Sequence, residues 1–163
     1  MAAAERASVR RVREALTERG ISPHLVKLEE TARSAKEAAE ALGVRVEQIV
    51  KSLVFRGARS GRPVLVLASG PNRADEGIVS ELVGEPIEKA DAAFVREKTG
   101  FAIGGVPPVG HAEPPVAFVD EDLLLYETVW AAAGHTHVVF GMAPERLPEI
   151  TAGRVVRIKS KER

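Results

Sequence analysis

Two apolar runs and the polar loop between them make up the segment Lys51-Ser-Leu-Val-Phe-Arg-Gly-Ala-Arg-Ser-Gly-Arg-Pro-Val-Leu-Val-Leu-Ala68. Residues Ser52–Arg56 and Pro63–Ala68 are dominated by aliphatic and aromatic side chains, a composition that predicts β-strands. The connection Gly57–Arg62 contains two glycines and is typical of a hairpin loop. The segment therefore predicts a strand hairpin, around which the other elements must be placed.

Helices are predicted on both sides of this hairpin in the sequence. Ser34 and Glu37 have the spacing of a capping box, and Gly43 is a natural stop for the Ala-rich run that follows them. Asp75 and Asp91 are of the residue type that accepts hydrogen bonds at the start of a helix. The predicted helices cover residues 2–19, 34–43, 75–83, 91–98 and 144–150, with a short helical turn at 44–49.

The remaining strands complete a mixed pattern. They are predicted at residues 24–28, 116–119, 128–133, 136–140 and 154–158, with Gly134 separating the third from the fourth. The stretch 100–115 is rich in Gly and Pro and is predicted to be irregular. We therefore expect an α+β fold with a central mixed β-sheet flanked by helices. A chain of 163 residues suits one core, so residues 1–163 are assigned to a single domain.

The composition excludes several classes of protein and site. The chain has no cysteine, which rules out disulfides, a thiolate nucleophile and Cys-ligated zinc. Neither a signal peptide nor an apolar stretch of about 18 residues is present, so we expect a cytoplasmic protein without a membrane partner. Aromatic residues make up only 4%, which limits stacking on nucleic-acid bases.

The charge balance is neutral, with 23 Lys and Arg against 23 Asp and Glu. No overall positive field would therefore steer a nucleic acid onto the surface. An RNA partner would need a local basic patch or the help of a partner protein. Two local sets could provide such a patch, although a solvated helix face and a chain terminus explain them equally well: Arg6, Arg10 and Arg13, and Arg154, Arg157, Lys159, Lys161 and Arg163.

Two features could carry chemistry. Lys51 begins an apolar strand. A lysine at this position can bind a phosphate or a carboxylate, and the alternative is that it protects the edge of a sheet. Gly104 and Gly105 begin the segment Gly-Gly-Val-Pro-Pro108, whose backbone could approach a ligand closely. Successive N–H groups in such a turn can stabilise the oxyanion of a tetrahedral intermediate, but a tight structural crossover is the alternative.

The histidines give no clear metal site. His135 and His137 are two residues apart, which would place both rings on one face of a strand. A closed metal site needs further ligands, and the sequence has no H-E-x-x-H pattern to supply them. The patterns of a serine hydrolase, a Walker loop and a dinucleotide fold are also absent. We therefore predict no metal and no cofactor.

Several segments, taken together, resemble the YbaK / aminoacyl-tRNA-synthetase-associated family, which includes free-standing relatives of the prolyl-tRNA synthetase editing insertion. They follow the family's order and cover nearly the whole chain. The lysine-led strand combined with the Gly-Gly-x-x-Pro loop is the most specific part. The segments are 31–43 (Thr-Ala-Arg-Ser-Ala-Lys-Glu-Ala-Ala-Glu-Ala-Leu-Gly), 49–55 (Ile-Val-Lys-Ser-Leu-Val-Phe), 98–110 (Lys-Thr-Gly-Phe-Ala-Ile-Gly-Gly-Val-Pro-Pro-Val-Gly), 116–120 (Val-Ala-Phe-Val-Asp) and 128–134 (Thr-Val-Trp-Ala-Ala-Ala-Gly).

The resemblance implies hydrolysis of wrongly aminoacylated tRNA in trans, without a metal. It gives Lys51 the place of the family lysine that anchors the substrate near the phosphate of the terminal adenosine. Gly104 and Pro108 match the family's G-x-x-x-P motif, whose backbone lies beside the scissile ester. Thr31 and Ser34 take places that line the aminoacyl pocket. The resulting set is Lys51, Gly104 and Gly105 as catalytic residues, with Thr31, Ser34, Val106, Pro107, Pro108 and His137 as substrate-binding residues.

The implied partner is the acceptor end of an aminoacyl-tRNA, with an aminoacyl-tRNA synthetase as a second candidate partner and no role for DNA. The sequence departs from the family pattern at one position that bears on which amino acid is removed. Bacterial relatives carry an Asp in the strand after Gly134, whereas this chain reads His137-Val-Val-Phe140. His137 is either a polar pocket residue or an outward-facing one, and Ala, Ser, Thr or another small amino acid is open as the residue removed. Tight binding without hydrolysis, as in a synthetase-regulating module, and a pure protein-interaction domain are the alternative functions.

Overall fold

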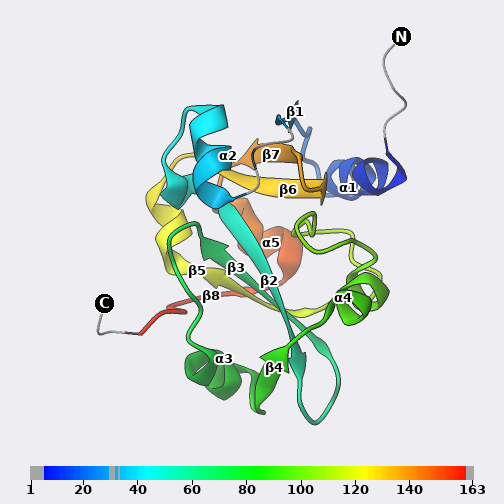
Figure 1. The fold of residues 1–163 in the computed structure, drawn as a ribbon, viewed down its shortest axis with the longest axis vertical. Helices are drawn as coiled ribbons and strands as arrows, with labels where there is room; N and C mark the ends of the chain where they lie inside the picture. The colour runs from blue at the N-terminus through cyan, green and yellow to red at the C-terminus, as the bar shows by residue number, and fades with distance from the viewer. Residues whose placement is uncertain (1–5, 30–31, 33, 161–163) are drawn as a thin grey trace.

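The computed structural model describes residues 6–29, 32 and 34–160 (Figure 1). Its helices are α1 (Ala7–Glu18), α2 (Ala35–Leu42), α3 (Glu76–Val83), α4 (Ala92–Thr99) and α5 (Arg146–Thr151), with short 3-10 helices η1 (Val46–Gln48) and η2 (Glu121–Leu125). Its strands are β1 (Leu25–Lys27), β2 (Val50–Gly57), β3 (Pro63–Ser69), β4 (Ile87–Lys89), β5 (Val116–Asp120), β6 (Val129–His135), β7 (Val138–Met142) and β8 (Arg154–Val156). None of the described helices is long and apolar enough to cross a lipid bilayer.

The larger sheet has five strands in the order β4-β2-β3-β5-β8. The predicted hairpin forms its centre, with Lys51 opposite Ala68 and Phe55 opposite Val64 in an antiparallel register. β5 runs parallel to β3, and β8 runs parallel to β5. The sheet is therefore mixed and has helices packed beside it, which confirms the predicted fold class.

β3 is buried on both faces of this sheet. Leu65 and Leu67 point into a core shared with α1, α4 and the smaller sheet. Val64 and Val66 point to the opposite side, where α3 covers them. A strand with a helix layer or a second sheet on either side needs a nearly unbroken apolar run, and Pro63-Val-Leu-Val-Leu-Ala-Ser69 is such a run.

The other strands form a separate antiparallel sheet in the order β1-β7-β6, so the strands divide between two sheets instead of forming one. An isolated bridge between Ile49 and Trp130 joins the sheets where β2 begins. α1 and α2 lie at this end of the molecule (Figure 1). The result is a compact junction between β2, the smaller sheet and α2.

Gly134 has a different role from the one predicted. It lies inside β6, with φ of +94°, and the turn between β6 and β7 falls on Thr136 and His137. A Cβ at position 134 would lie 2.6 Å from the carbonyl oxygen of Ser8. Glycine is needed there because α1 packs directly on this strand, and the tertiary contact rather than a chain reversal explains the residue.

Most predicted elements are confirmed within a few residues. The capping box joins Ser34 and Glu37, and Gly43 ends α2 in the left-handed conformation. Asp75 and Asp91 accept hydrogen bonds from the first turns of α3 and α4. Two elements were not predicted, β4 and η2, because a three-residue strand reading Ile-Glu-Lys has no recognisable apolar alternation and η2 depends on its packing.

A buried carboxylate holds the ends of β3 and β5 together. Asp120 is 1% exposed, and its Oδ2 accepts hydrogen bonds from the Ser69 N–H (2.9 Å) and the Asn72 side-chain amide (2.8 Å). Its Oδ1 accepts the Asp122 N–H at 3.0 Å. The Asn72 amide also donates to Asp122, which forms an ion pair with Lys159. This network fixes the turn that follows β3.

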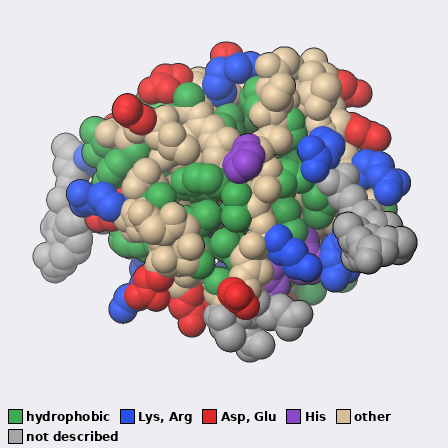
Figure 2. All heavy atoms as spheres, turned by 90° about the horizontal axis from the view of Figure 1, so that it is seen from above, with side chains coloured by type: hydrophobic (Ala, Val, Ile, Leu, Met, Phe, Trp, Pro, Cys, Tyr) green, Lys and Arg blue, Asp and Glu red, His purple; other side chains and the backbone are tan. Residues whose placement is uncertain are grey.

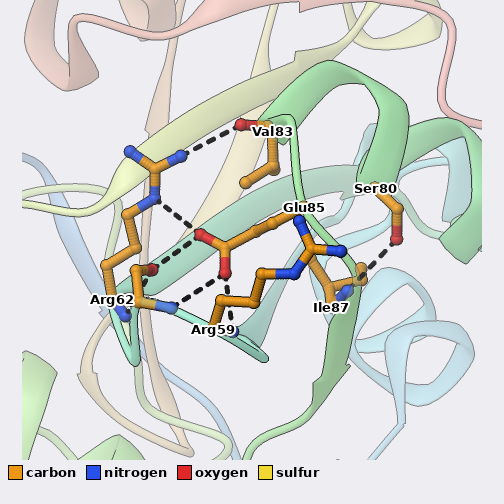
Figure 3. A network of polar contacts seen from close by, with 7 residues as sticks. Arg59, Arg62, Ser80, Val83, Glu85 and Ile87 are labelled. Atoms are coloured by element: carbon orange, nitrogen blue, oxygen red, sulfur yellow. Dashed lines mark hydrogen bonds and ion pairs between the residues drawn. The ribbon is translucent and has the colours of Figure 1, made fainter.

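A second carboxylate fastens the far end of the hairpin (Figure 3). The Glu85 side chain, 8% exposed, accepts hydrogen bonds from the N–H groups of Arg59 and Ser60 and from the Ser60 hydroxyl. Arg62 forms an ion pair with it at 3.4 Å and donates to the Val83 carbonyl. The hydrogen bonds from Ser60 and Arg59, followed by the charge of Arg62, lower the pKa of Glu85 to about 2.

We predict that Asp120→Ala lowers the free energy of unfolding by about 3 kcal/mol, because it leaves buried N–H donors without acceptors. Urea denaturation followed by circular dichroism measures this loss. The control is Glu121→Ala, which removes an exposed carboxylate from the next residue and should change stability by less than about 0.5 kcal/mol. Equal effects of the two substitutions would contradict the assigned role of Asp120.

Glu85 should make stability depend on acid pH. Because its folded pKa of about 2 lies below the unfolded value of 4.5, its stabilisation is present above pH 4.5 and is lost as the pH falls toward 2. The melting temperature of Glu85→Gln should therefore lie below that of the wild type at pH 6, and the gap should narrow at pH 3. Glu81→Gln, on an exposed position of α3, serves as the control. A gap that stays constant between pH 6 and pH 3 would refute this explanation.

Candidate active site

Two adjoining cavities lie beside the start of β2 and share part of their walls. The first has a volume of about 410 Å³ and the second about 350 Å³. The shared wall comes from β2 and from the loop before β5. Its residues are Lys51, Ser52, Leu53, Ile103, Gly104 and Val106. The lysine and the glycine loop that the sequence singled out therefore meet at one place.

Lys51 is the second residue of β2 and is half-buried. Its Nζ donates a hydrogen bond to the carbonyl oxygen of Asn72 at 2.6 Å. Burial, with a further contribution from the positive charge of Arg73, lowers the pKa of Lys51, while Asp120 opposes this shift. The ammonium group is thus held at a set position, beside another cation, with hydrogen-bond donors left for a ligand.

The first cavity has a cationic rim. Arg73 and Lys89 line it together with Lys51, and Glu76 is the acidic residue among its lining. Three cations around one opening favour an anionic ligand, and phosphate groups are the anions that Lys and Arg bind most readily in this way.

The second cavity is largely apolar. Of its described lining residues, Ser34, Ser52 and Thr136 contribute hydroxyl groups and Lys51 contributes a charge. Its apolar lining is Leu28, Ala32, Ala35, Ala38, Ile49, Val50, Leu53, Ile103, Val106, Trp130, Ala132 and Val139. α1, α2 and β7 lie at one end of the molecule (Figure 1). At the centre of that surface, apolar side chains gather, and charged side chains surround them (Figure 2). The second cavity therefore suits an uncharged group of modest size.

Ser52 is a polar residue of this site that the sequence did not single out. It lines both cavities, and its Oγ is buried without a hydrogen-bond partner in the described part of the chain. A buried hydroxyl without a partner is unfavourable unless a ligand or water satisfies it.

The glycine loop presents backbone rather than side chains. Gly104 has φ of +92°, and a Cβ on Gly105 would lie 2.9 Å from the backbone nitrogen of His135. The Gly105 N–H donates to the carbonyl oxygen of Ala102 at 3.0 Å, so it is not available to a ligand. Within residues 6–29, 32 and 34–160, the N–H groups of Gly104 and Val106 have no hydrogen-bond partner. The expected run of successive donors is thus reduced to these two.

The prolines of the loop lie deeper. Pro107 and Pro108 are buried and line neither cavity of the site. Pro108 borders a separate cavity with His111, whose Nε2 contacts the Pro107 carbonyl oxygen at 2.6 Å. Burial lowers the pKa of His111, so the neutral ring that donates to this carbonyl is favoured. The structure therefore places both prolines behind the loop, as its support.

The other predicted substrate-binding residues differ in their positions. Ser34, the cap of α2, lines the second cavity, whereas Thr31 lies outside the described residues. His137 lies in the β6–β7 turn and lines neither cavity, and its neighbour Thr136 takes the position at the wall.

The two histidines do not occupy one strand face as predicted, because a turn separates them. The His135 Nδ1 accepts the His137 N–H at 3.2 Å, and the rings are 5.6 Å apart. Among the described residues, no three His, Cys, Asp or Glu side chains are grouped closely enough to hold a metal ion.

None of the described members of the two basic sets named from the sequence lines either cavity. Arg6, Arg10 and Arg13 are exposed at α1 and line neither of them. Lys159 pairs with Asp122, whereas Lys161 and Arg163 lie outside the described residues. Arg73 was missed because a single arginine in a loop has no sequence pattern, and only the turn after β3 brings it near Lys51.

The sequence pattern of the aminoacyl-tRNA editing domain matches residues 29–150. Protein YwhH of Bacillus subtilis is 30% identical over 91% of this chain and 94% of its own. EbsC of Enterococcus faecalis, named as a proposed Cys-tRNA(Pro)/Cys-tRNA(Cys) deacylase, is 28% identical over 79% of each chain. Proline–tRNA ligase of Maridesulfovibrio salexigens is 36% identical over 68% of this chain and 20% of the ligase.

A solved structure agrees with these relatives. It belongs to a proposed trans-editing enzyme for prolyl-tRNA synthetase and is 49% identical, with a TM-score of 0.90 over 96% of this chain and 99% of that one. Apart from Leu28, the residues that line the two cavities lie within the matched residues 29–150. The chain belongs to the aminoacyl-tRNA editing domain family.

Proposed function

We propose that this protein hydrolyses the ester bond of wrongly aminoacylated tRNA in trans. The observation that carries the proposal is the junction of a cationic cavity with an apolar one at Lys51 and Gly104. The 3′ end of an aminoacyl-tRNA has the same two parts, a phosphate-bearing nucleotide and an amino acid, with the scissile ester between them. Membership of the editing-domain family supports this assignment.

The polarity of the cavities orients the substrate. The terminal adenosine enters the first cavity, where Lys51 holds its 5′-phosphate as a point charge. The aminoacyl side chain enters the second cavity beside Ser34 and Trp130. The ester carbonyl then lies at the shared wall, against Gly104 and Ser52.

Hydrolysis at this wall needs a positioned water and an anion-stabilising group. The water oxygen attacks the ester carbonyl, and the N–H groups of Gly104 and Val106 stabilise the oxyanion that forms. The tetrahedral intermediate then breaks its bond to the ribose oxygen, which takes the proton from the attacking water. The products are the free amino acid and a tRNA with an intact 3′ end. In this reaction the Ser52 hydroxyl orients the attacking water or the ester.

The apolar second cavity favours a small, uncharged amino acid. Among the described residues, no Asp or Glu lines it, and the strand that follows the β6–β7 turn carries none. Relatives named for Cys-tRNA(Pro) and for prolyl-tRNA synthetase point to tRNA(Pro) as the first substrate to test. A synthetase that delivers this tRNA, in the cytoplasm, would also compensate for the neutral net charge of the chain.

Lys51→Ala should abolish most deacylation because the phosphate anchor is lost. We expect kcat/KM for a mischarged tRNA to fall at least about 100-fold, which is near the cost of losing a charge-assisted contact to a phosphate. The release of radiolabelled amino acid from a panel of mischarged tRNAs measures this change in kcat/KM. The matched control is Lys27→Ala, which removes an exposed lysine of β1 and should retain full activity.

Two outcomes would refute this function. No turnover of any mischarged tRNA by the wild type would exclude a deacylase. Binding of a non-hydrolysable aminoacyl-adenosine analogue without any turnover would instead identify a binding module. Circular dichroism of Lys51→Ala establishes that a loss of activity does not come from unfolding.

Ser52→Ala should lower deacylation activity without lowering the stability of the protein. The substitution removes a buried hydroxyl that has no partner in the described part of the chain, so the melting temperature should stay unchanged or rise slightly. If the hydroxyl orients the water or the ester, kcat should fall by about tenfold, the effect of one lost hydrogen bond. Unchanged kcat together with a reduced melting temperature would show that Ser52 is a packing residue.

A further inference from the structure

Arg73 lies on the wall between the first cavity and a third one. The third cavity has a volume of about 360 Å³ and is lined by Pro71, Asn72, Arg73, Ala74, Asp75, Lys159 and Ser160. Arg73 belongs to the lining of both, and its side chain is exposed. A strand of nucleic acid that enters the first cavity from this side must pass the guanidinium group.

The backbone of Arg73 is held firmly. The preceding residue, Asn72, receives a hydrogen bond from Lys51 on its carbonyl and donates two from its amide to Asp120 and Asp122. At the start of the same turn, a Cβ on Gly70 would lie 2.1 Å from a carbonyl oxygen of η1, so this backbone is in direct contact with its neighbour. The position of Arg73 relative to Lys51 is therefore set by the fold.

Asp120 and Asp122, the two carboxylates bound by Asn72, are already engaged. Asp120 accepts hydrogen bonds from Ser69, Asn72 and Asp122, and Asp122 is paired with Lys159. Among the residues that the structure describes, the guanidinium of Arg73 has no hydrogen-bond or ion-pair partner, although Glu76 also lines the first cavity. Its charge is felt by Lys51, whose pKa it helps to lower. Two adjacent cations in one wall are unfavourable unless an anion lies near both.

We propose that Arg73 binds the 5′-phosphate of the penultimate nucleotide of the substrate, while Lys51 binds that of the terminal adenosine. The inference rests on the proposed function and names the part of the tRNA that is recognised. Guanidinium groups suit this task because their planar donors match two phosphate oxygens at once. Arg73 is thus a substrate-binding residue that distinguishes a polynucleotide end from a single aminoacylated nucleoside.

Short substrates that differ by one phosphate test this assignment. We would compare aminoacylated cytidylyl-adenosine (CpA) with the same dinucleotide carrying a 5′-phosphate (pCpA), and use aminoacyl-adenosine as the baseline. The wild type should have a kcat/KM about tenfold higher for pCpA than for CpA, the value of one exposed charge-assisted contact. Arg73→Ala should lose this gain, so that its kcat/KM is the same for pCpA as for CpA, and Arg73→Lys should keep part of the gain.

Arg59→Ala provides the matched control. It removes one exposed positive charge from the hairpin loop, at the opposite end of β2 from Lys51, and should leave the gain from the phosphate unchanged. If Arg73→Ala keeps the full gain, or lowers activity on all three substrates equally, the assignment is wrong. Equilibrium binding of CpA and pCpA without an amino acid tests Arg73 separately, so failure of the deacylase function itself would be recognised as a different result.

Discussion

The buried carboxylate of Asp120 lies where the parallel strands β3 and β5 end, and it accepts hydrogen bonds from the buried Ser69 N–H and from two part-buried donors, the Asn72 amide and the Asp122 N–H. Through Asn72 it fixes the turn after β3, and through that turn it fixes the acceptor for the Lys51 ammonium group. The cost of leaving a buried donor unsatisfied is about twice the net value of an ordinary hydrogen bond, which makes this arrangement hard to alter. The geometry of the site follows from it.

The site itself is composite, because no single element contains it. β2 provides Lys51 and Ser52, and α2 and the smaller sheet close the apolar cavity. The loop before β5 provides the N–H groups of Gly104 and Val106, which have no partner among the described residues. The proposed hydrolysis uses this division in place of a thiolate or a metal, since the chain has no cysteine and the described residues include no group of three metal ligands. An aminoacyl ester is already activated, so positioning and oxyanion stabilisation provide most of what the reaction needs.

The neutral net charge is compatible with an RNA substrate once the positions of the charges are known. Three cations line the first cavity, namely Lys51, Arg73 and Lys89. Three carboxylates instead form hydrogen bonds or ion pairs with other residues of the chain, namely Asp120, Asp122 and Glu85. In the proposed function, this site binds the end of a tRNA through a few phosphates, rather than its body through many. The count of charges in the sequence conceals this separation.

The sequence by itself determined the local structure: the β2–β3 hairpin, the capped helices, and the presence of a lysine and a Gly-Gly-x-x-Pro loop whose resemblance indicated the family. These features depend on residues close together in the chain, such as Ser34 with Glu37. Only the tertiary structure decided the division into two sheets, the packing of α1 on Gly134, and the positions of Ser52, Arg73 and Asp120. It also moved His137 and both prolines away from the cavity wall. Those properties depend on contacts between residues far apart in sequence, such as Ser69 with Asp120, which no local pattern encodes.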